Sequence, residues 1–207
     1  MMQARCGGII LSGGLNRRMQ GRNKALLELD GRSFLERIVS NLTGCFEQLL
    51  LVTKKPEFYK SSTFRTVKDI INVQSPLAGI HAGLVNMDAD YGFCTSCDIP
   101  LLRTDLVRIL INEIDPDFDI IVPSSGSFFQ PLCAVYSKQC IPIIEKYLKD
   151  DEVKTDGIYE MLRVKTIDYR QLQTVDPLLE SFFNVNTPDD LRIVRQILKG
   201  RPTEIAG

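Results

Sequence analysis

The sequence predicts an α/β protein with one mostly parallel, twisted sheet that is covered by helices on both faces. Strand-like and helix-like segments alternate along most of the 207 residues, as in chains that are built from β-α-β units. Short apolar runs such as Gly8–Leu11 and Leu49–Val52 lack polar alternation, which is typical of strands that are buried on both faces. We expect a single domain over residues 1–207.

The strands are expected where such runs precede turns or small polar loops. They are Gly8–Leu11, Leu49–Val52, Thr66–Lys68, Tyr91–Ser96, Asp119–Val122, Pro131–Tyr136 and Val164–Tyr169. Each strand of a parallel sheet needs a crossover, and helical patterns stand between most of these runs.

The helices are predicted from their start signals and apolar spacing. Ser33 and Glu36 have the spacing of a capping box, and Thr187-Pro188 is an N-cap and first-turn pair for a closing helix that ends before Gly200. Thr104 is expected to cap a helix that continues to about Ile114. The remaining expected helices are Ala78–Met87 and Pro142–Leu148, and Gly79 and Gly83 in the first of them are expected to allow a close approach to another backbone.

Composition limits the classes of partner. The formal net charge is −1, so no global field attracts nucleic acid or an anionic membrane. No apolar run reaches the roughly 18 residues of a membrane span, and the chain starts without a secretory pattern. Six cysteines in so apolar a chain are not a disulfide scaffold. We therefore expect a cytoplasmic protein with no nucleic-acid partner and no membrane partner.

The segment after the first strand is the strongest candidate site. It contains Ser12, Gly13 and Gly14 and then several basic residues that end at Lys24. Paired glycines let backbone N–H groups approach phosphate oxygens, and ligands bind at the carboxyl edge of such sheets. The segment matches neither the P-loop nor the dinucleotide-binding pattern. Phosphate binding is the favoured interpretation, and a solvated basic loop is the alternative.

Asp98 is the second candidate. It follows the strand Tyr91–Ser96, at the same predicted edge. A carboxylate there can hold Mg²⁺ against phosphates that the first loop binds. The alternative is an aspartate that only caps a turn. The basic loop on the same edge favours the metal.

Two further features are interpreted as structural. Cys94 and Cys97 have the spacing of redox and zinc motifs, but Cys94 lies inside a strand and no second pair accompanies it. Two buried thiols are the favoured interpretation. His81 is the only histidine, and a residue on a helix surface is more common in such surroundings than a general base.

Several motifs together resemble the molybdenum cofactor guanylyltransferases, within the short nucleotidyltransferases that have a Rossmann-like, nucleotide-diphospho-sugar transferase-like fold. The matching segments are Leu11–Lys24, Pro76–Ile80, Ala82–Leu84, Cys97–Pro100, Gln130–Tyr136 and Phe183–Leu191. The resemblance implies transfer of GMP from GTP to the terminal phosphate of molybdopterin, with release of pyrophosphate. It implies a nucleotide-binding N-terminal half and an acceptor-binding C-terminal half.

The resemblance also assigns roles to individual residues. Lys24, Arg18 and Asp98 become the candidate catalytic residues, and Asp98 the ligand of Mg²⁺. The expected nucleotide contacts are Leu11, Ser12, Gly13, Gly14, Lys24, Asp69 and Asp98, and the expected acceptor contacts are Gln130, Pro131, Asn184 and Asn186. GTP and molybdopterin are the implied substrates, and molybdoenzyme maturation proteins are candidate partners.

The chain departs from the family pattern at four positions. Ser75, Asn23 and Gln20 stand where family members commonly have Gly, Asp and Gly, and Val52 stands where some have Asn. Two alternatives stay open: the same chemistry with another nucleotide or acceptor, such as CTP or a sugar phosphate, and a binding protein without catalytic activity. Joint presence of Lys24 and Asp98 favours an enzyme.

Overall fold

The computed structural model describes residues 5–13, 24–59, 63–150 and 152–200. Its centre is a sheet in which seven strands follow the order β10, β7, β9, β6, β1, β4, β5, with β8 paired to β7. Their bounds are Cys6–Ser12 (β1), Leu49–Thr53 (β4), Arg65–Val67 (β5), Tyr91–Ser96 (β6), Ile120–Ser125 (β7), Phe128–Phe129 (β8), Cys133–Ser137 (β9) and Val164–Asp168 (β10). A separate hairpin joins β2 (Glu28–Leu29) to β3 (Arg32–Ser33).

The sheet is mostly parallel, as predicted. Strand β1 is parallel to both β4 and β6, while β9 is antiparallel to β6 and β7. The chain between β7 and β9 covers only residues 126–132, whereas a parallel crossover needs a dozen or more residues. The short connection therefore forces β9 to reverse direction.

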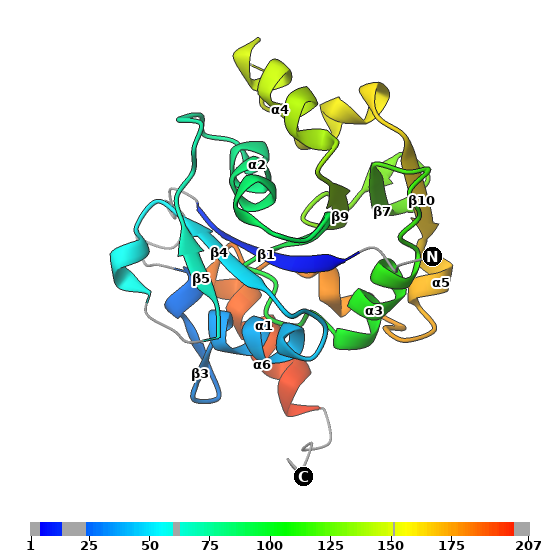
Figure 1. Ribbon diagram of the computed structural model, residues 1–207. Helices are drawn as coiled ribbons and strands as arrows, with labels where there is room; N and C mark the ends of the chain where they lie inside the picture. The colour runs from blue at the N-terminus through cyan, green and yellow to red at the C-terminus, as the bar shows by residue number, and fades with distance from the viewer. Residues whose placement is uncertain (1–4, 14–23, 60–62, 151, 201–207) are drawn as a thin grey trace.

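Helices cover both faces of the sheet (Figure 1). Helices α2 and α4 lie above it in that view, and α1, α3 and α6 lie below it. The bounds are Phe34–Thr43 (α1), Pro76–Asn86 (α2), Thr104–Asn112 (α3), Cys140–Lys149 (α4), Tyr169–Leu172 (α5) and Pro188–Lys199 (α6), with short 3₁₀ turns at Lys24–Leu26, Pro56–Phe58, Thr155–Met161 and Glu180–Phe182. This is the two-sided α/β architecture that the sequence predicts.

Strand alternation divides the core into two layers. Ile9 and Leu11 of β1 pack on the side of α2 and α4, and Ile10 packs on the side of α1 and α3. A Cβ at Gly83 would lie 2.6 Å from Ile9 Cδ1, and one at Gly79 would lie 2.9 Å from Leu11 Cδ2. The glycines therefore serve a close approach, as predicted, although the neighbours are side chains of β1.

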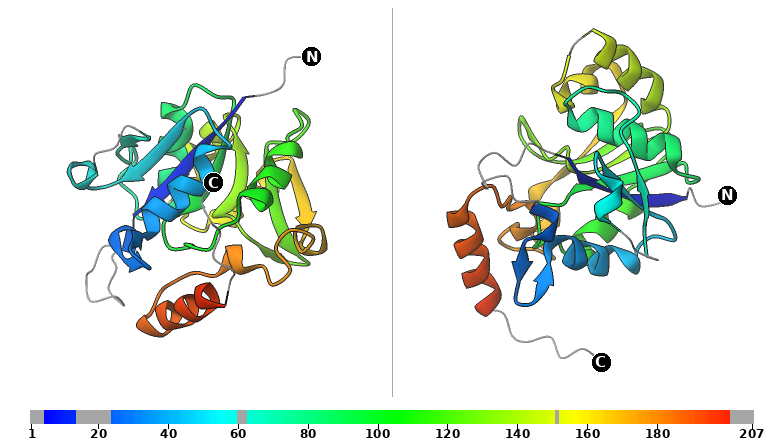
Figure 2. Two further views of the ribbon diagram at one scale, coloured as in Figure 1. Left: turned by 90° about the horizontal axis from the view of Figure 1, so that it is seen from below. Right: turned by 90° about the vertical axis from the view of Figure 1, so that its left-hand side faces the viewer.

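Helix α6 lies at one end of the lower layer, beside the β2–β3 hairpin (Figure 2). Its Val194 joins a small third core that is formed with Leu29, Phe34, Leu101 and Val185. This core joins the last segment of the chain to the turn after β6, which carries Asp98.

Two of the three predicted helix caps are confirmed and one is not, while α2 and α4 each begin two residues before their predicted starts. Ser33 and Thr187 both form complete capping boxes. Thr104 is the first helical residue of α3, and the N-cap is Arg103, which makes no side-chain capping bond. The Thr104 hydroxyl instead donates to the carbonyl of Asn41 at 3.0 Å. The prediction of Thr104 as the cap was therefore wrong, because the last extended residue before the helix is Arg103, so that Thr104 already lies inside the first turn.

His81 also differs from the prediction. Its side chain is 2% exposed, and its Nε2 lies 3.0 Å from Glu145 Oε1 of α4. Helix α2 is apolar on nearly all sides and has buried residues from Leu77 to Leu84. It packs against both the sheet and α4, so that the histidine lies inside the interface between the two helices.

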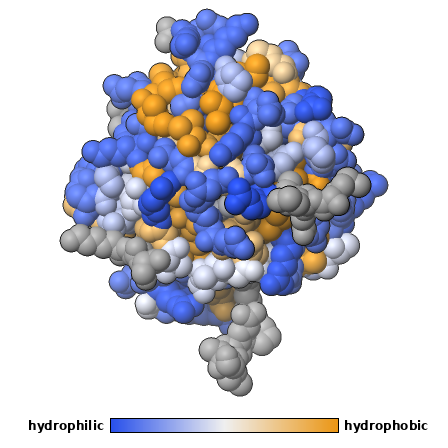
Figure 3. Space-filling view, viewed as in Figure 1, coloured by the Kyte–Doolittle hydropathy of each residue, from blue (hydrophilic) through white to orange (hydrophobic). Residues whose placement is uncertain are grey.

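The face of the molecule that Figure 1 shows is largely hydrophilic, and a group of apolar residues lies over α2 (Figure 3). Val85 of α2 is 44% exposed. No helix among the described residues is long and apolar enough to cross a membrane.

Candidate active site

Lys24 lies between two residues that are distant in the sequence. Its Nζ donates to Asp98 Oδ2 at 3.2 Å and to Asn186 Oδ1 at 2.6 Å. The side chains of Lys24 and Asp98 are only 12% and 19% exposed. The structure thus brings together a predicted catalytic lysine, the predicted metal-binding aspartate and a predicted acceptor residue.

Asp98 is held by the end of β6 and by the chain before α6. Ser96 donates its hydroxyl to Asp98 Oδ1 at 2.6 Å, and the backbone N–H of Val185 donates to the Asp98 carbonyl at 2.8 Å. The N–H of Cys97 bonds to the carbonyl of Leu11 at 3.0 Å, which continues the contact between β6 and β1. These bonds fix the turn that presents the carboxylate at the carboxyl edge of the sheet.

Asn186 is oriented by the capping box of α6. The carboxylate of Asp190 accepts the backbone N–H groups of Asn186 at 2.9 Å and Thr187 at 2.8 Å. The N–H of Asn186 lowers the pKa of Asp190 below its ordinary value, so the carboxylate stays ionised at the helix N-terminus, where negative charge is favourable. The start of α6 therefore fixes the backbone of Asn186, whose side-chain amide contacts Lys24.

A cavity of about 320 Å³ adjoins this cluster. It lies at the carboxyl ends of β1, β4 and β6 and at the start of α2, and Ser96 belongs both to its wall and to the Asp98 cluster. Its lining residues are Leu11, Gly13, Val52, Lys54, Asp69, Val73, Gln74, Ser75, Pro76, Gly79, Ser96 and Leu132. Three of the predicted nucleotide contacts, Leu11, Gly13 and Asp69, thus share one pocket.

Asp69 is the acidic group of the cavity wall. Burial raises the pKa of Asp69 above its ordinary value, and the positive charge of Lys54 opposes this shift. Sequence reasoning missed Lys54. The signal was present, because Lys54 directly follows the buried strand that ends at Thr53, and ligands meet parallel sheets at that edge.

Ser75 explains one departure from the family pattern. It is the N-cap of α2, and its hydroxyl accepts the N–H of Leu77 at 3.2 Å and donates to the carbonyl of Val153 at 2.9 Å. The hydroxyl therefore starts the helix at the cavity wall. Val52 also lines the cavity, where its apolar side chain offers no hydrogen bond.

Ser12 is not one of the residues that line the cavity. Its hydroxyl lies 3.0 Å from the hydroxyl of Tyr59. Gly14 and Arg18, together with the departures Gln20 and Asn23, lie outside the described residues. Their predicted roles stay predictions.

The other predicted acceptor residues bond to other partners. Gln130 donates its side-chain amide to the Tyr169 hydroxyl at 2.8 Å, and the Pro131 carbonyl accepts from the Tyr136 hydroxyl at 2.8 Å. Asn184 is exposed and bonds to the carbonyl of Phe182 at 3.3 Å. Of the four predicted acceptor residues, all of which the structure describes, only Asn186 forms a hydrogen bond with Lys24.

The cysteines are buried or half-buried and all six are free. Burial raises the pKa of Cys97 to about 12 and that of Cys94 well above its ordinary range. Both are therefore thiols at neutral pH, whereas zinc binding and nucleophilic attack need thiolates.

Asp98 fits a metal that is shared with a substrate. In the described part of the chain, no three His, Cys, Asp or Glu side chains gather to form a metal site by themselves. Mg²⁺ commonly takes one or two carboxylates and completes its shell with water and substrate phosphates. One carboxylate beside a lysine is a donor set of that kind.

The α/β fold, together with Lys24 and Asp98 at the carboxyl edge of the sheet, is that of a nucleotidyltransferase. Residues 8–168 match the model of the MobA-like NTP transferase domain. A molybdenum cofactor guanylyltransferase from Desulfosudis oleivorans is 35% identical over 93% of this chain and 95% of its own length. The chain belongs to the family of MobA-like NTP transferase domains.

Solved structures support the same fold. Molybdopterin-guanine dinucleotide biosynthesis protein A from Archaeoglobus fulgidus has a TM-score of 0.82 at 24% identity and covers 94% of this chain and 100% of that one. A 4-diphosphocytidyl-2C-methyl-D-erythritol synthase from Anaerococcus prevotii has a TM-score of 0.70 at 16% identity, with coverage of 95% and 97%. The second protein's name refers to a cytidylyl product, so the fold alone does not select the base.

Proposed function

We propose that this protein transfers GMP from GTP to the terminal phosphate of molybdopterin and releases pyrophosphate. The observation that carries the proposal is the meeting of Lys24, Asp98 and Asn186 beside a cavity that contains Asp69. The guanylyltransferase from Desulfosudis oleivorans, which matches nearly the whole chain, supports the choice of nucleotide and acceptor.

The cavity suits a purine nucleotide. Its apolar wall includes Leu11 and Val52, and the carboxylate of Asp69 is available on the same wall. A carboxylate can accept two N–H groups at once, and guanine presents N1–H and N2–H side by side. Cytosine lacks this donor pair, so the half-buried carboxylate of Asp69 would lose the two hydrogen bonds that guanine offers.

Lys24 and Asp98 would act on the phosphates. The ammonium of Lys24 can neutralise charge that grows on the departing pyrophosphate. Asp98 would hold Mg²⁺ together with the nucleotide phosphates, and the ion would supply further charge neutralisation there. Arg18 is proposed to add positive charge from the loop before Lys24.

The acceptor does not need a base. A phosphate monoester has its second pKa near 6 and is already a dianion for the most part at neutral pH. The protein's task is then to align that phosphate with the α-phosphate of GTP and to neutralise charge. This agrees with a buried His81 that is paired with Glu145 of α4.

The acceptor would reach the site along the C-terminal half of the chain. Asn186, through its contact with Lys24, is the residue that joins the two substrates in this scheme. Gln130, Pro131 and Asn184 are proposed to contact molybdopterin further out. Molybdoenzyme maturation proteins are the candidate recipients of the product.

The proposed location is the cytoplasm. All six cysteines are free, which is the expected state in a reducing compartment. The burial of four of them keeps their thiols away from solvent.

One experiment separates the possible functions. Purified protein is incubated with Mg²⁺ and molybdopterin, and pyrophosphate release is measured with GTP, CTP and ATP in parallel and in competition. We expect release that requires molybdopterin and a kcat/KM that is highest for GTP. A higher value for CTP would assign the protein to cytidylyl transfer. No release with any nucleotide, in the presence of measurable GTP binding, would favour a binding protein.

A further inference from the structure

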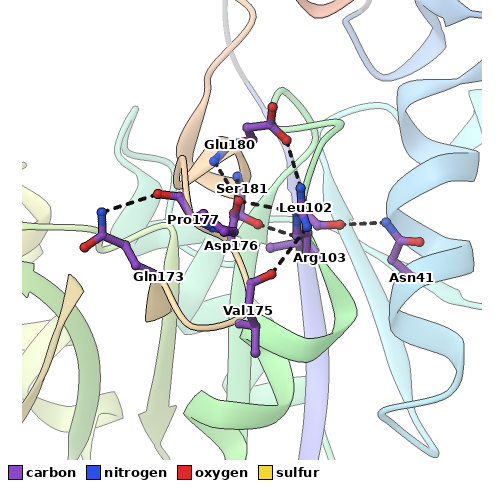
Figure 4. Close-up of polar contacts among 9 residues, drawn as sticks. All are labelled: Asn41, Leu102, Arg103, Gln173, Val175, Asp176, Pro177, Glu180 and Ser181. Atoms are coloured by element: carbon purple, nitrogen blue, oxygen red, sulfur yellow. Dashed lines mark hydrogen bonds and ion pairs between the residues drawn. The ribbon is translucent and has the colours of Figure 1, made fainter. Parts of the chain in front are cut away.

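An ionic cluster around one fully buried carboxylate joins the segment after Asp98 to residues 175–181 and takes no part in the proposed chemistry. Asp176 is 0% exposed. Its carboxylate accepts the backbone N–H groups of Glu180 at 3.1 Å and Ser181 at 2.8 Å, and Oδ1 lies 3.3 Å from Arg103 Nε (Figure 4). The Arg103 contact is an ion pair without a hydrogen bond from Nε. Burial of a carboxylate is costly unless hydrogen-bond donors and a positive charge surround it.

Arg103 holds the turn that contains Asp176 at several points. Its Nη2 donates to Glu180 Oε2 at 3.1 Å, and its Nη1 donates to the Val175 carbonyl at 3.3 Å. Its backbone N–H also donates to the hydroxyl of Ser181 at 3.0 Å. Arg103 thus binds residues 175–181 with both its main chain and its side chain.

The residues on either side of Arg103 are fixed to α1. Asn41 donates its side-chain amide to the carbonyl of Leu102 at 2.6 Å, and its own carbonyl accepts from Thr104. Figure 4 shows Asn41 and Asp176 on opposite sides of Arg103. The arginine is therefore anchored to a core helix before it reaches the turn.

The turn itself depends on the carboxylate. Leu179 has a φ of 51°, in the left-handed region that non-glycine residues rarely adopt. Its N–H bonds to the Asp176 carbonyl at 2.9 Å, and the next two N–H groups are those that bond to the Asp176 carboxylate. Strain of this kind persists only where the surroundings fix the conformation.

Both segments in the cluster continue into the active site. Residues 98–103 carry Asp98 at one end and Arg103 at the other, and residues 176–186 carry Asp176 and Asn186. The two segments meet again where the Val185 N–H donates to the Asp98 carbonyl. The ionic cluster is thus a second cross-link between the chains that carry the two partners of Lys24.

We propose that Asp176 and Arg103 are positioning residues for the transfer reaction. Their ion pair fixes the segment that carries Asn186 against the segment that carries Asp98, and so sets the position of Lys24 between them. The proposal rests on the proposed function for its kinetic part. It makes no use of the nucleotide cavity, whose lining residues do not include any residue of the cluster.

The main test is Asp176→Asn, which keeps the shape and removes the charge. We expect kcat for pyrophosphate release to fall by about 10- to 100-fold, the scale of a small misplacement of reacting groups, with a smaller loss of GTP affinity because the Lys24 ammonium is still present. Asp119→Asn is the matched control, because Asp119 is 6% exposed and bonds to the guanidinium and backbone N–H of Arg163. Asp119 directly precedes β7 and so lies at the amino end of that strand, whereas Asp98 follows the carboxyl end of β6. We expect the control to lose stability and keep its kcat.

A double-mutant comparison shows whether Asp176 acts through Asn186. If it does, Asp176→Asn lowers kcat much less in an Asn186→Ala background than in the wild type, because the side chain to be positioned is gone. Equal fold-losses in both backgrounds would overturn the proposal, as would a loss in Asp176→Asn no larger than in Asp119→Asn. If Asp176→Asn does not fold, Ser181→Ala removes one bond of the cluster and serves in the same comparison.

Hydrogen exchange provides a test that needs no turnover. The amide of Val185, which bonds to Asp98, should exchange faster in Asp176→Asn than in the wild type and remain at the wild-type rate in Asp119→Asn. An unchanged exchange rate of the Val185 amide in Asp176→Asn would contradict the positioning role, whatever the activity of the variant. Failure of the wild type to turn over GTP would refute only the proposed function.

Discussion

The ammonium of Lys24 donates a 2.6 Å hydrogen bond to the side-chain oxygen of Asn186, which lies 162 residues further along the chain. The same nitrogen is 3.2 Å from Asp98. Three segments that are remote in sequence therefore meet at one lysine. The two acceptors orient the ammonium of Lys24 so that it can bind phosphate oxygens when a nucleotide is present.

Lys24→Ala should lower both kcat and the affinity for GTP. We expect kcat to fall by about 10²- to 10³-fold, as for other preorganised contacts to developing charge. Steady-state kinetics and isothermal titration with GTP measure the two effects separately. Lys165→Ala is a suitable control. Lys165 also pairs with a carboxylate, that of Glu113 at 3.0 Å, but it lies on β10 and has no proposed role in the site. A loss of affinity without a loss of kcat would make Lys24 a ground-state contact only.

Asp98→Asn should make turnover insensitive to Mg²⁺ in the range where the wild type responds. The substitution keeps the shape and removes the charge that would hold the ion, so kcat should drop by about two orders of magnitude. Titration of Mg²⁺ at fixed GTP is the measurement. Ser96→Ala removes only the neighbouring hydroxyl and should have a smaller effect. Normal turnover of Asp98→Asn at low Mg²⁺ would contradict the metal assignment.

Asp69 should give GTP binding a pH dependence of definite sign. Burial raises the pKa of Asp69, and the positive charge of Lys54 opposes this shift. As the pH falls, the free protein therefore protonates Asp69 at a higher pH than an ordinary aspartate, whose pKa is about 3.9. Binding of guanine needs the carboxylate, so affinity should weaken as pH falls through the raised pKa of Asp69, and binding should release protons around that pKa.

Asp69→Asn provides the comparison for this pH effect. The phosphates of GTP titrate in both proteins, so the difference between wild type and variant isolates Asp69. We expect weaker GTP binding and a reduced preference for GTP over CTP in the variant. Identical pH profiles for the two proteins would show that Asp69 does not meet the base.

Cys94→Ala and Cys97→Ala should remain active. Both thiols are buried in the structure and neutral at pH 7, so they contribute packing and no chemistry. We expect a loss of about 0.5–3 kcal/mol in the free energy of unfolding, as for most substitutions. Denaturant unfolding and kinetics measure the two quantities, and metal analysis should find no stoichiometric zinc. Tightly bound zinc that disappears with either cysteine would overturn this interpretation.

Much of the fold follows from local patterns in the sequence. The apolar runs predict the buried strands, and the pairs Ser33 with Glu36 and Thr187 with Pro188 predict the starts of α1 and α6. These features depend on neighbours within a few residues, for which spacing and residue type are sufficient. The reversed strand β9 was also predictable, from the short connection after β7.

Other features required partners from elsewhere in the chain. Thr104 has the residue type of a helix cap, but the helix begins at Thr104 itself, and its hydroxyl donates to the carbonyl of Asn41 in α1. His81 has small neighbours in the sequence, and only the packing of α2 against α4 buries it and brings Glu145 to it. A one-dimensional pattern describes a helix face but not what covers that face.

The sequence by itself determined the class of the protein: an α/β chain with a basic glycine loop and an aspartate at the same sheet edge, with Asn184–Asn186 near its end. Parallel strands bring their carboxyl ends to one edge, so Gly13 and Asp98 were expected at the same edge, and the pairing of β1 with β6 makes them neighbours. The tertiary structure decided that Asn186 also contacts Lys24 and that Arg103 anchors the turn around Asp176. Such contacts depend on how α6 and the chain before it pack, because nothing in local sequence fixes the distance between segments that are joined only by the fold.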